Sequence, residues 1–169
     1  MNWLAKLLPW KTAKADQAAT NQLYSQLFAS VEEKSGVQLA PETLTSVVGF
    51  NAGGPVNLRF APNKKIFLTS ELAMYEQQRR SADGLFRYEL MTQSHFEENT
   101  ARTLLTAIGA MTLSTVLGDR HTIDVSAVMG ASGPAVVKLK LYSRTRFSGL
   151  EYGVYQLLPN HKKQSSVQT

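Results

Sequence analysis

Apolar residues recur at helical spacing over residues 16–34. Asp16 stands where an N-terminal cap is expected, and Gly36 follows as a stop signal. The apolar stripe comprises Leu23, Tyr24, Leu27, Phe28 and Val31. A single stripe of this kind predicts a helix that turns one side toward a core.

A second helical pattern begins at residue 94. The tetrapeptide SHFE at 94–97 has the spelling of a capping box, in which serine and glutamate satisfy each other's helix-end amides. The apolar positions that follow are Leu104, Leu105, Ile108, Met111, Leu113, Val116 and Leu117. Because Gly118 then ends the pattern, we expect a long helix of about 23 residues with these side chains in the core.

Seven shorter runs have the alternation or the β-rich composition typical of strands. They are residues 44–50, 56–60, 65–70, 85–93, 121–127, 134–142 and 150–158. The period of two is clearest over 85–93, so we expect one buried face there and a polar face that carries Arg87 and Glu89. The last two runs are predicted to pair as a hairpin across SRTRFSG at 143–149.

Two helices and consecutive groups of strands predict the α+β class. We expect a mixed, largely antiparallel sheet packed on one side against the long helix, with an additional N-terminal helix. A chain of 169 residues is long enough for one domain. The predicted organisation is an amphipathic N-terminal segment at 1–15, an α+β domain at 16–159 and a disordered tail at 160–169.

The N-terminal segment contains both tryptophans of the chain. Its apolar residues, at roughly helical spacing, are Trp3, Leu4, Leu7, Leu8 and Trp10. Two interpretations stay open: the stripe docks on a membrane interface or a partner, or it folds back onto its own domain. We expect no secretory signal, because the opening has one lysine and only a few apolar residues before Pro9, and no small-residue cleavage site follows a long apolar stretch. We expect no transmembrane segment, because the longest uncharged runs, 43–58 and 103–118, are too short and contain Thr, Ser and Gly.

The chain contains no cysteine, which excludes a disulfide framework, thiol catalysis and thiolate metal sites. This composition fits a reducing cytoplasm. The net charge of +5 is distributed unevenly, with 12 basic and 12 acidic residues in 1–124 but 6 basic and 1 acidic in 125–169. The positive excess therefore belongs to the C-terminal part of the chain.

Four of these cations alternate along one predicted strand and its turn. They are Lys138, Lys140, Arg144 and Arg146, and the alternation places all four on one face. Such a face attracts an acidic partner or phosphates. The favoured interpretation is the solvated outer face of an antiparallel sheet, because no nucleic-acid-binding motif accompanies the four residues.

Residue patterns for common site chemistry are weak. His95, His121 and His161 lie far apart without metal-ligand spacing, so we expect no metal. The glycines at 53–54 precede a predicted strand and not a helix, so no phosphate-binding loop and no cofactor is expected. Ser132 lies outside any GxSxG frame, and we expect no catalytic residue.

The most polar cluster is DRHTID at 119–124, directly after the second predicted helix. On a strand, His121 and Ile123 face one way while Thr122 and Asp124 face the other. His121 and Asp124 therefore do not form a natural pair. We favour structural hydrogen bonding at a helix-to-strand turn over catalysis.

Three segments, in their order and spacing, resemble the suppressor of fused-like domain. They are residues 71–93, 104–126 and 149–159. RYEL at 87–90 is similar to the family's strand motif, and DRHTID at 119–124 to its GHTID-like turn. The resemblance covers 48–159 and departs from the family at Arg120, where the motif has glycine.

The resemblance implies a binding domain and not an enzyme. The animal relative is a two-domain repressor that clamps a transcription-factor peptide, partly as an added strand. Bacterial members are often single domains proposed as immunity proteins against toxins. We therefore expect a non-enzymatic, cytoplasmic protein-binding domain that neutralises a toxin or sequesters a protein partner. The expected partner-binding residues are Arg87, Glu89, His121, Asp124, Lys138, Lys140, Arg144 and Arg146. The alternative is binding of nucleic acid or a phosphate surface through the basic C-terminal strands.

Overall fold

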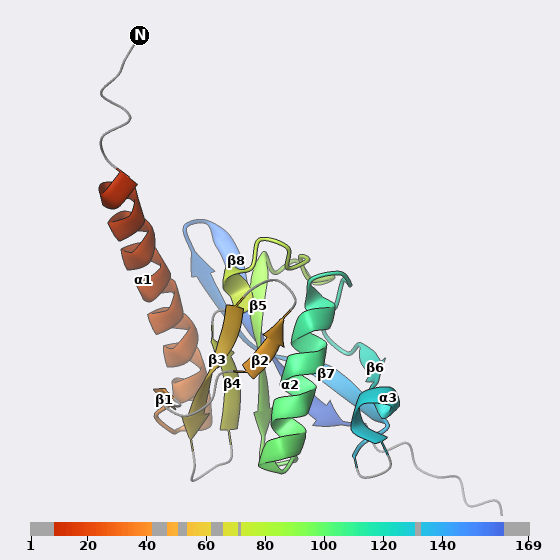
Figure 1. Ribbon diagram of the computed structural model, residues 1–169. Coiled ribbons are helices and arrows are strands. Elements are labelled where there is room, and N and C mark those ends of the chain that lie inside the picture. The colour runs from red at the N-terminus through yellow and green to blue at the C-terminus, as the bar shows by residue number, and fades with distance from the viewer. Residues whose placement is uncertain are drawn as a thin grey trace, which may run out of the picture.

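The computed structural model describes residues 9–41, 47–50, 54–61, 66–70, 72–130 and 133–160 (Figure 1). The helices are α1 (Pro9–Ser35), α2 (Glu98–Thr112) and α3 (Ser126–Met129), with a short 3₁₀ helix, η3 (Leu72–Met74). The strands are β1 (Ala40–Pro41), β2 (Val47–Phe50), β3 (Gly54–Ala61), β4 (Ile66–Ser70), β5 (Arg87–Gln93), β6 (Thr122–Asp124), β7 (Val136–Phe147) and β8 (Leu150–Pro159). The tail at 161–169 and the first eight residues of the amphipathic segment lie outside the described residues.

Within the described part of the chain, the strands form one mixed sheet. Its order is β1-β3-β4-β5-β8-β7-β6, and β2 pairs with β3. The pair β5–β8 is parallel and the other pairs are antiparallel. β7 and β8 form the expected hairpin through Ser148 and Gly149, both with positive φ, as a type I′ hairpin turn requires. The α+β class with a mixed, largely antiparallel sheet is confirmed.

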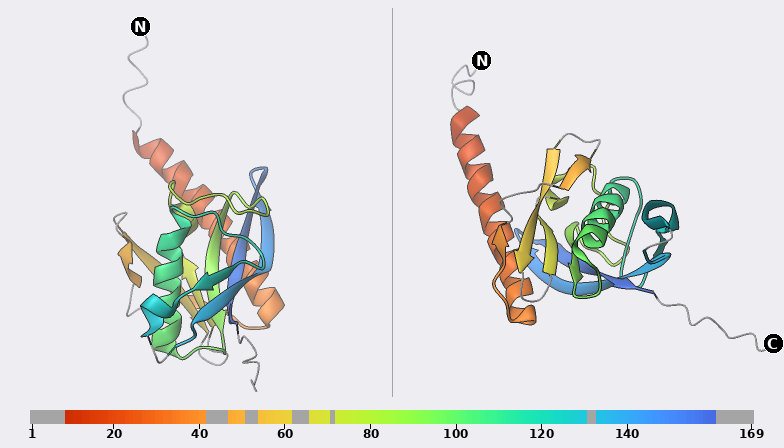
Figure 2. Two further views of the ribbon diagram at one scale, coloured as in Figure 1. Left: turned by 90° about the vertical axis from the view of Figure 1, so that its right-hand side faces the viewer. Right: turned by 60° about the horizontal axis from the view of Figure 1, so that its bottom comes forward.

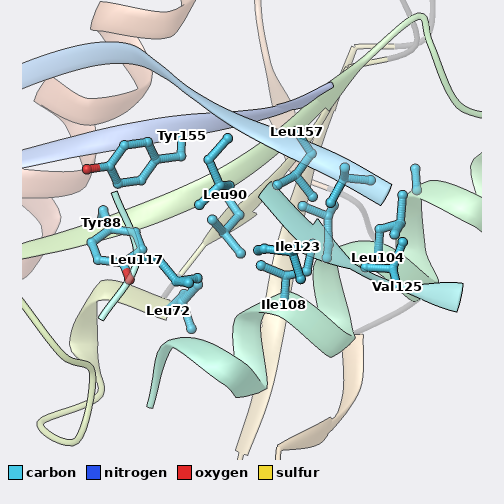
Figure 3. Packing of buried hydrophobic residues seen from close by; sticks show 14 of the residues in the cluster. Leu72, Tyr88, Leu90, Leu104, Ile108, Leu117, Ile123, Val125, Tyr155 and Leu157 are labelled. Atoms are coloured by element: carbon cyan, nitrogen blue, oxygen red, sulfur yellow. The ribbon is translucent and has the colours of Figure 1, made fainter. Parts of the chain in front are cut away.

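The sheet is covered on both faces, with α1 on one side and α2 on the other (Figure 2). The buried residues of the α1 face are Leu23, Tyr24, Leu27, Val31, Leu39, Ile66, Leu68, Met91, Tyr152 and Val154. The core of the α2 face includes Phe67, Leu90, Leu104, Leu105, Ile108, Ile123, Val137, Leu139, Tyr155 and Leu157 (Figure 3). The stripe predicted on the first helix is therefore the side that packs on the sheet.

β5 lies in the middle of the sheet and is buried on both sides. Its five interior residues, from Tyr88 to Thr92, are all buried. Tyr88 and Leu90 join the core under α2, and Met91 joins the core under α1. The prediction of a polar face on this strand is therefore wrong, because α1 covers the side on which Glu89 lies.

α2 has 15 residues, fewer than the roughly 23 expected. It begins after Glu97 without a side-chain cap, and Ser94 has a left-handed backbone with φ 44°. The expected capping box is therefore absent. At the other end, the amide of Arg79 donates to the Thr112 carbonyl at 2.9 Å, so a neighbouring loop satisfies this helix end and the chain turns away.

α1 begins at Pro9 and runs for 27 residues. Proline suits the first helical position because its missing amide has no partner there. Asp16 lies inside this helix and is not its cap, so α1 crosses the boundary predicted after residue 15. Among the described side chains, the first buried one is Leu23, and the N-terminal end projects beyond the sheet (Figure 1). None of the described helices has the length and apolar character needed to span a bilayer.

Candidate binding surface at the edge strand

β6 ends the sheet, and of the described strands only β7 pairs with it. Ile123 lies opposite Val137, and both side chains are buried in the core under α2. Figure 3 shows Ile123 in this core. The Leu139 amide donates to the His121 carbonyl at 2.8 Å, and the Val125 amide donates to the Ala135 carbonyl at 2.9 Å, so residues 121, 123 and 125 bond to β7. The amide and carbonyl of Thr122 therefore point away from β7, toward the edge.

A hollow of about 660 Å³ lies between the C-terminal end of α2 and β6. Its lining residues are Met111, Thr115, Val116, Leu117, Arg120, His121, Thr122, Ile123 and Asp124. Four of these residues, Met111, Val116, Leu117 and Ile123, are apolar, and the other five are polar or charged. Val116 is 53% exposed, although helical spacing predicted it in the core. We call this the apolar hollow.

A second hollow, of about 240 Å³, borders the same turn. Its lining residues are Asp119, Arg120, Lys138, Leu139, Lys140, Leu141 and Leu158. Three cations and one carboxylate give this lining a net positive charge, and leucines supply its apolar part. We call it the basic hollow. Arg120 lines both hollows.

The backbone of Arg120 is left-handed, with φ 67°. Residues with a Cβ rarely adopt this conformation, whereas glycine adopts it readily. The position is also the one where the resembled motif has glycine. The Arg120 amide donates to the Leu139 carbonyl at 2.9 Å, and Asp119 Oδ1 accepts from the Leu141 amide at 2.7 Å. These bonds hold the turn against β7 in spite of its unfavourable dihedral angle.

The turn also packs closely against the loop before β5. A Cβ on Gly118 would lie 2.8 Å from Ala82 Cβ and 2.9 Å from Asp83 Oδ1, so this contact requires glycine. Asp83 Oδ1 accepts from the Asp119 amide at 3.2 Å and from the Tyr155 hydroxyl. The position of Arg120 is therefore set by contacts on both sides of the turn.

Two residues expected in the site, His121 and Asp124, line the apolar hollow, and both are exposed. Asp124 Oδ1 accepts from the Ser126 amide at 2.9 Å and from its hydroxyl at 2.6 Å. α3 begins at Ser126, so the strand predicted over 121–127 is shorter than expected. Asp124 thus connects the edge strand to this short helix.

The four C-terminal cations do not share one face, which corrects the prediction. A β-bulge between Leu141 and Ser143 shifts the alternation of β7 by one residue. Lys138 and Lys140 lie opposite Leu158 and Gln156 of β8, whereas Arg144 and Arg146 lie opposite Gly153 and Glu151. Because even and odd residues of β8 face opposite ways, the two lysines lie on one face of the sheet and the two arginines on the other.

The two arginines of this set have partners near the hairpin. Arg144 Nη2 lies 3.3 Å from Asp83 Oδ2, and Arg146 Nε lies 3.6 Å from Glu151 Oε1. Neither arginine lines the apolar or the basic hollow. Of the four cations, only the two lysines therefore belong to the surface around β6.

Glu89 is fully buried, so it is not part of a surface face. Its Oε1 accepts from the Tyr24 hydroxyl at 2.6 Å and from the Ala73 amide at 2.8 Å, and its Oε2 lies 2.5 Å from the Thr69 hydroxyl. Burial raises the pKa of Glu89 to about 7, although these hydrogen bonds favour the charged form. The side chain connects α1, β4 and η3, and it is out of reach of a partner in this structure.

Arg87 is half-buried at the start of β5. Its guanidinium donates to the carbonyls of Phe86 and Glu76, each at 2.8 Å, and its Cζ lies 4.4 Å from the centre of the Phe86 ring. These contacts stabilise the loop before the strand. Arg87 and Glu89 therefore lie outside both hollows.

Sequence reasoning missed Arg120 as a site residue and assigned Met111, Val116 and Leu117 to the core. Leu117 is indeed buried, whereas Val116 is exposed in the apolar hollow. The sequence feature that could have identified Arg120 is that it occupies a turn position where glycine is favoured.

No protein-family model, curated protein or solved structure matches this chain. The resemblance to the suppressor of fused-like domain accordingly rests on the motifs quoted for it. Among the described residues, there is no group of three histidine, aspartate or glutamate side chains that could hold a metal ion.

Proposed function

We propose that this protein is a non-enzymatic protein-binding domain that holds an extended segment of its partner along β6. The observation that carries the proposal is the apolar hollow beside the edge strand. The same surface offers the exposed Val116 and the half-buried Met111 for further burial, and it offers backbone groups of β6 that point away from β7. Peptide recognition by strand addition uses both features.

Backbone bonding supplies the first part of the interaction. The amide and carbonyl of Thr122 face outward, so an added strand can exchange two hydrogen bonds there. β6 has only three residues, and so short an edge gives little opportunity for unwanted pairing between copies. The partner segment therefore needs further contacts beyond the backbone.

The apolar hollow supplies those contacts. Alternate side chains of an added strand point to the same side, so every second residue can enter the hollow. Val116 is half-exposed at its border, and burying the rest of this side chain contributes about 1 kcal/mol. Apolar burial at the centre with polar groups around it is the composition typical of protein interfaces.

The biological role that we propose is sequestration of a protein partner in the cytoplasm, with a toxin as the candidate that the family resemblance suggests. Nucleic-acid binding is the less favoured alternative. It relied on four cations on one face, and the bulge in β7 separates Lys138 and Lys140 from Arg144 and Arg146.

The experiment compares capture of a partner from the native host by the wild type and three variants of the full chain. Val116→Asp places a charge in the apolar hollow, and Thr122→Pro removes the outward amide at an edge position where proline is tolerated. Val128→Asp is the matched control, because Val128 is 50% exposed on α3 and does not line the hollow.

We expect the wild type and Val128→Asp to retain the same protein at a reproducible stoichiometry, and the two variants at the hollow to lose it. Circular dichroism establishes that all forms are folded. The proposal fails if the wild type retains no protein at a defined ratio. It also fails if both hollow variants retain the partner as well as the control does.

A further inference from the structure

Arg120 lies where the two hollows meet, on a backbone conformation that disfavours it. Its side chain is 85% exposed and lines both hollows. Its positive φ is unfavourable for any residue with a Cβ, and glycine would adopt the same turn with less strain. Folding alone therefore gives no reason for arginine here, and strained positions of this kind often occur at functional sites.

The fold holds the guanidinium of Arg120 only loosely. In its ion pair with Asp119, the Nε atom of Arg120 lies 3.5 Å from Asp119 Oδ2, which is longer than a charge-assisted hydrogen bond. Asp119 uses its other oxygen to accept from the Leu141 amide at 2.7 Å, which fixes this carboxylate on the backbone of β7. The guanidinium is therefore open to a ligand from outside the chain.

Two lysines extend the positive charge of Arg120 into the basic hollow. Lys138 and Lys140 lie on the same face of β7, and both are exposed. The lining also includes Leu141 and Leu158, which can contact the apolar part of a bound side chain. The volume of about 240 Å³ is below the roughly 300–1,000 Å³ typical of small-molecule sites, which favours a single side chain as the occupant.

On the basis of the function proposed above, we propose that the partner segment is acidic and that the basic hollow binds one of its Asp or Glu carboxylates. Arg120 provides the planar donor pair that fits a carboxylate, and Lys138 and Lys140 add charge. Apolar residues of the same segment occupy the apolar hollow on the other side of Arg120. Arg120 thus determines which residue of the partner enters which hollow.

The linings favour a polypeptide over a nucleic acid. A run of consecutive phosphates would place negative charge beside Asp119 and Asp124 as well as beside the cations, whereas a peptide can place a carboxylate at the cations and apolar residues elsewhere. Neither lining contains Phe, Tyr or Trp, the side chains on which single-stranded nucleic acids stack their bases. An acidic segment with interspersed apolar residues matches both hollows.

The test measures binding of labelled probes to the full chain by fluorescence anisotropy. The probes are a peptide of about ten residues in which glutamate alternates with valine, the same peptide with lysine in place of glutamate, and an oligothymidylate of similar length. The variants are Arg120→Gly and, as the matched control, Arg146→Gln, which removes one positive charge outside both hollows.

We expect the wild type to bind the glutamate peptide most tightly, and Arg120→Gly to raise its Kd about tenfold. The Tm of Arg120→Gly should be equal to or higher than that of the wild type, because glycine relieves the left-handed strain. Arg146→Gln should change the Kd by less than about twofold, because dissolved salt screens the attraction between the peptide and a surface charge outside the hollows.

Several results would overturn this inference: no binding of the glutamate peptide, tighter binding of oligothymidylate, equal binding of the lysine peptide, or equal losses in both variants. The capture experiment reports separately on the proposed function. A partner that is lost with Val116→Asp but retained by Arg120→Gly leaves the protein-binding function intact and refutes the acidic anchor alone.

Discussion

Replacing Glu89 with glutamine separates the charge of this buried side chain from its shape. Tyr24 and Ala73 both donate to Oε1, and Oε2 faces the Thr69 hydroxyl. The Thr69 hydroxyl also lies 3.2 Å from the Leu90 carbonyl. In the neutral carboxyl, Oε2 can donate to Thr69 Oγ1 while Thr69 donates to Leu90, and the amide nitrogen of glutamine can donate in the same place.

The magnitude follows from the pKa of Glu89, which burial raises from 4.5 to about 7. A folded-state pKa above the unfolded value means that the fold binds this proton more tightly than the unfolded chain does. The stabilisation is fully present below about pH 4.5 and is lost as the pH rises through about 7. At about 1.4 kcal/mol per pKa unit, the loss is roughly 3 kcal/mol.

Urea denaturation followed by circular dichroism between about pH 4.5 and pH 8 measures this effect. We expect Glu89→Gln to match the wild type at the acidic end and to exceed its free energy of unfolding by roughly 3 kcal/mol at the alkaline end. The difference between the two proteins is the informative quantity, because other titrating groups contribute equally to both.

Glu98→Gln is the matched control, because Glu98 is an exposed side chain paired with Arg102 on α2. The same chemical change there should leave the pH dependence of stability close to that of the wild type. A difference between Glu89→Gln and the wild type that stays constant across the pH range would refute the argument. A variant that is less stable than the wild type at every pH would refute it as well.

Two further substitutions test the packing of the sheet. Gly153→Ala would place its Cβ 2.7 Å from the Ser143 carbonyl oxygen and 2.8 Å from Leu85 Cδ1. We therefore expect the free energy of unfolding to fall by about 1–3 kcal/mol. An unchanged urea midpoint would contradict this close approach. Leu27→Ala removes a fully buried side chain between α1 and the sheet. We expect the free energy of unfolding to fall by about 2–5 kcal/mol, and proteases to cleave α1 faster than in the wild type. A loss below about 1 kcal/mol would show that α1 is not part of the core.

Much of the secondary structure could be predicted because side-chain periodicity records how each element is buried. The stripe on the first helix is the side that packs on the sheet, and the hairpin of β7 and β8 has the predicted partners. Helix ends were harder to predict. The SHFE tetrapeptide has the right spelling for a cap, but the left-handed backbone of Ser94 leaves the helix to begin after Glu97.

The site was predictable only in part, because its residues meet through tertiary contacts. His121, Asp124, Lys138 and Lys140 line the two hollows as candidate binding residues. Alternation alone cannot show a bulge, so it could not separate the lysines from the arginines of β7. The sequence marked Arg120 only as a departure from a turn motif.

The amino-acid sequence by itself determined the α+β class, the main helices and strands, and the uneven distribution of charge, since these depend on local period and composition. Only the tertiary structure decided that α1 covers the second face of the sheet and buries Glu89, and that two hollows share Arg120 beside β6. The physical reason is that the repeat of apolar positions along an element shows which of its sides is buried. What covers that side depends on segments far away in the chain.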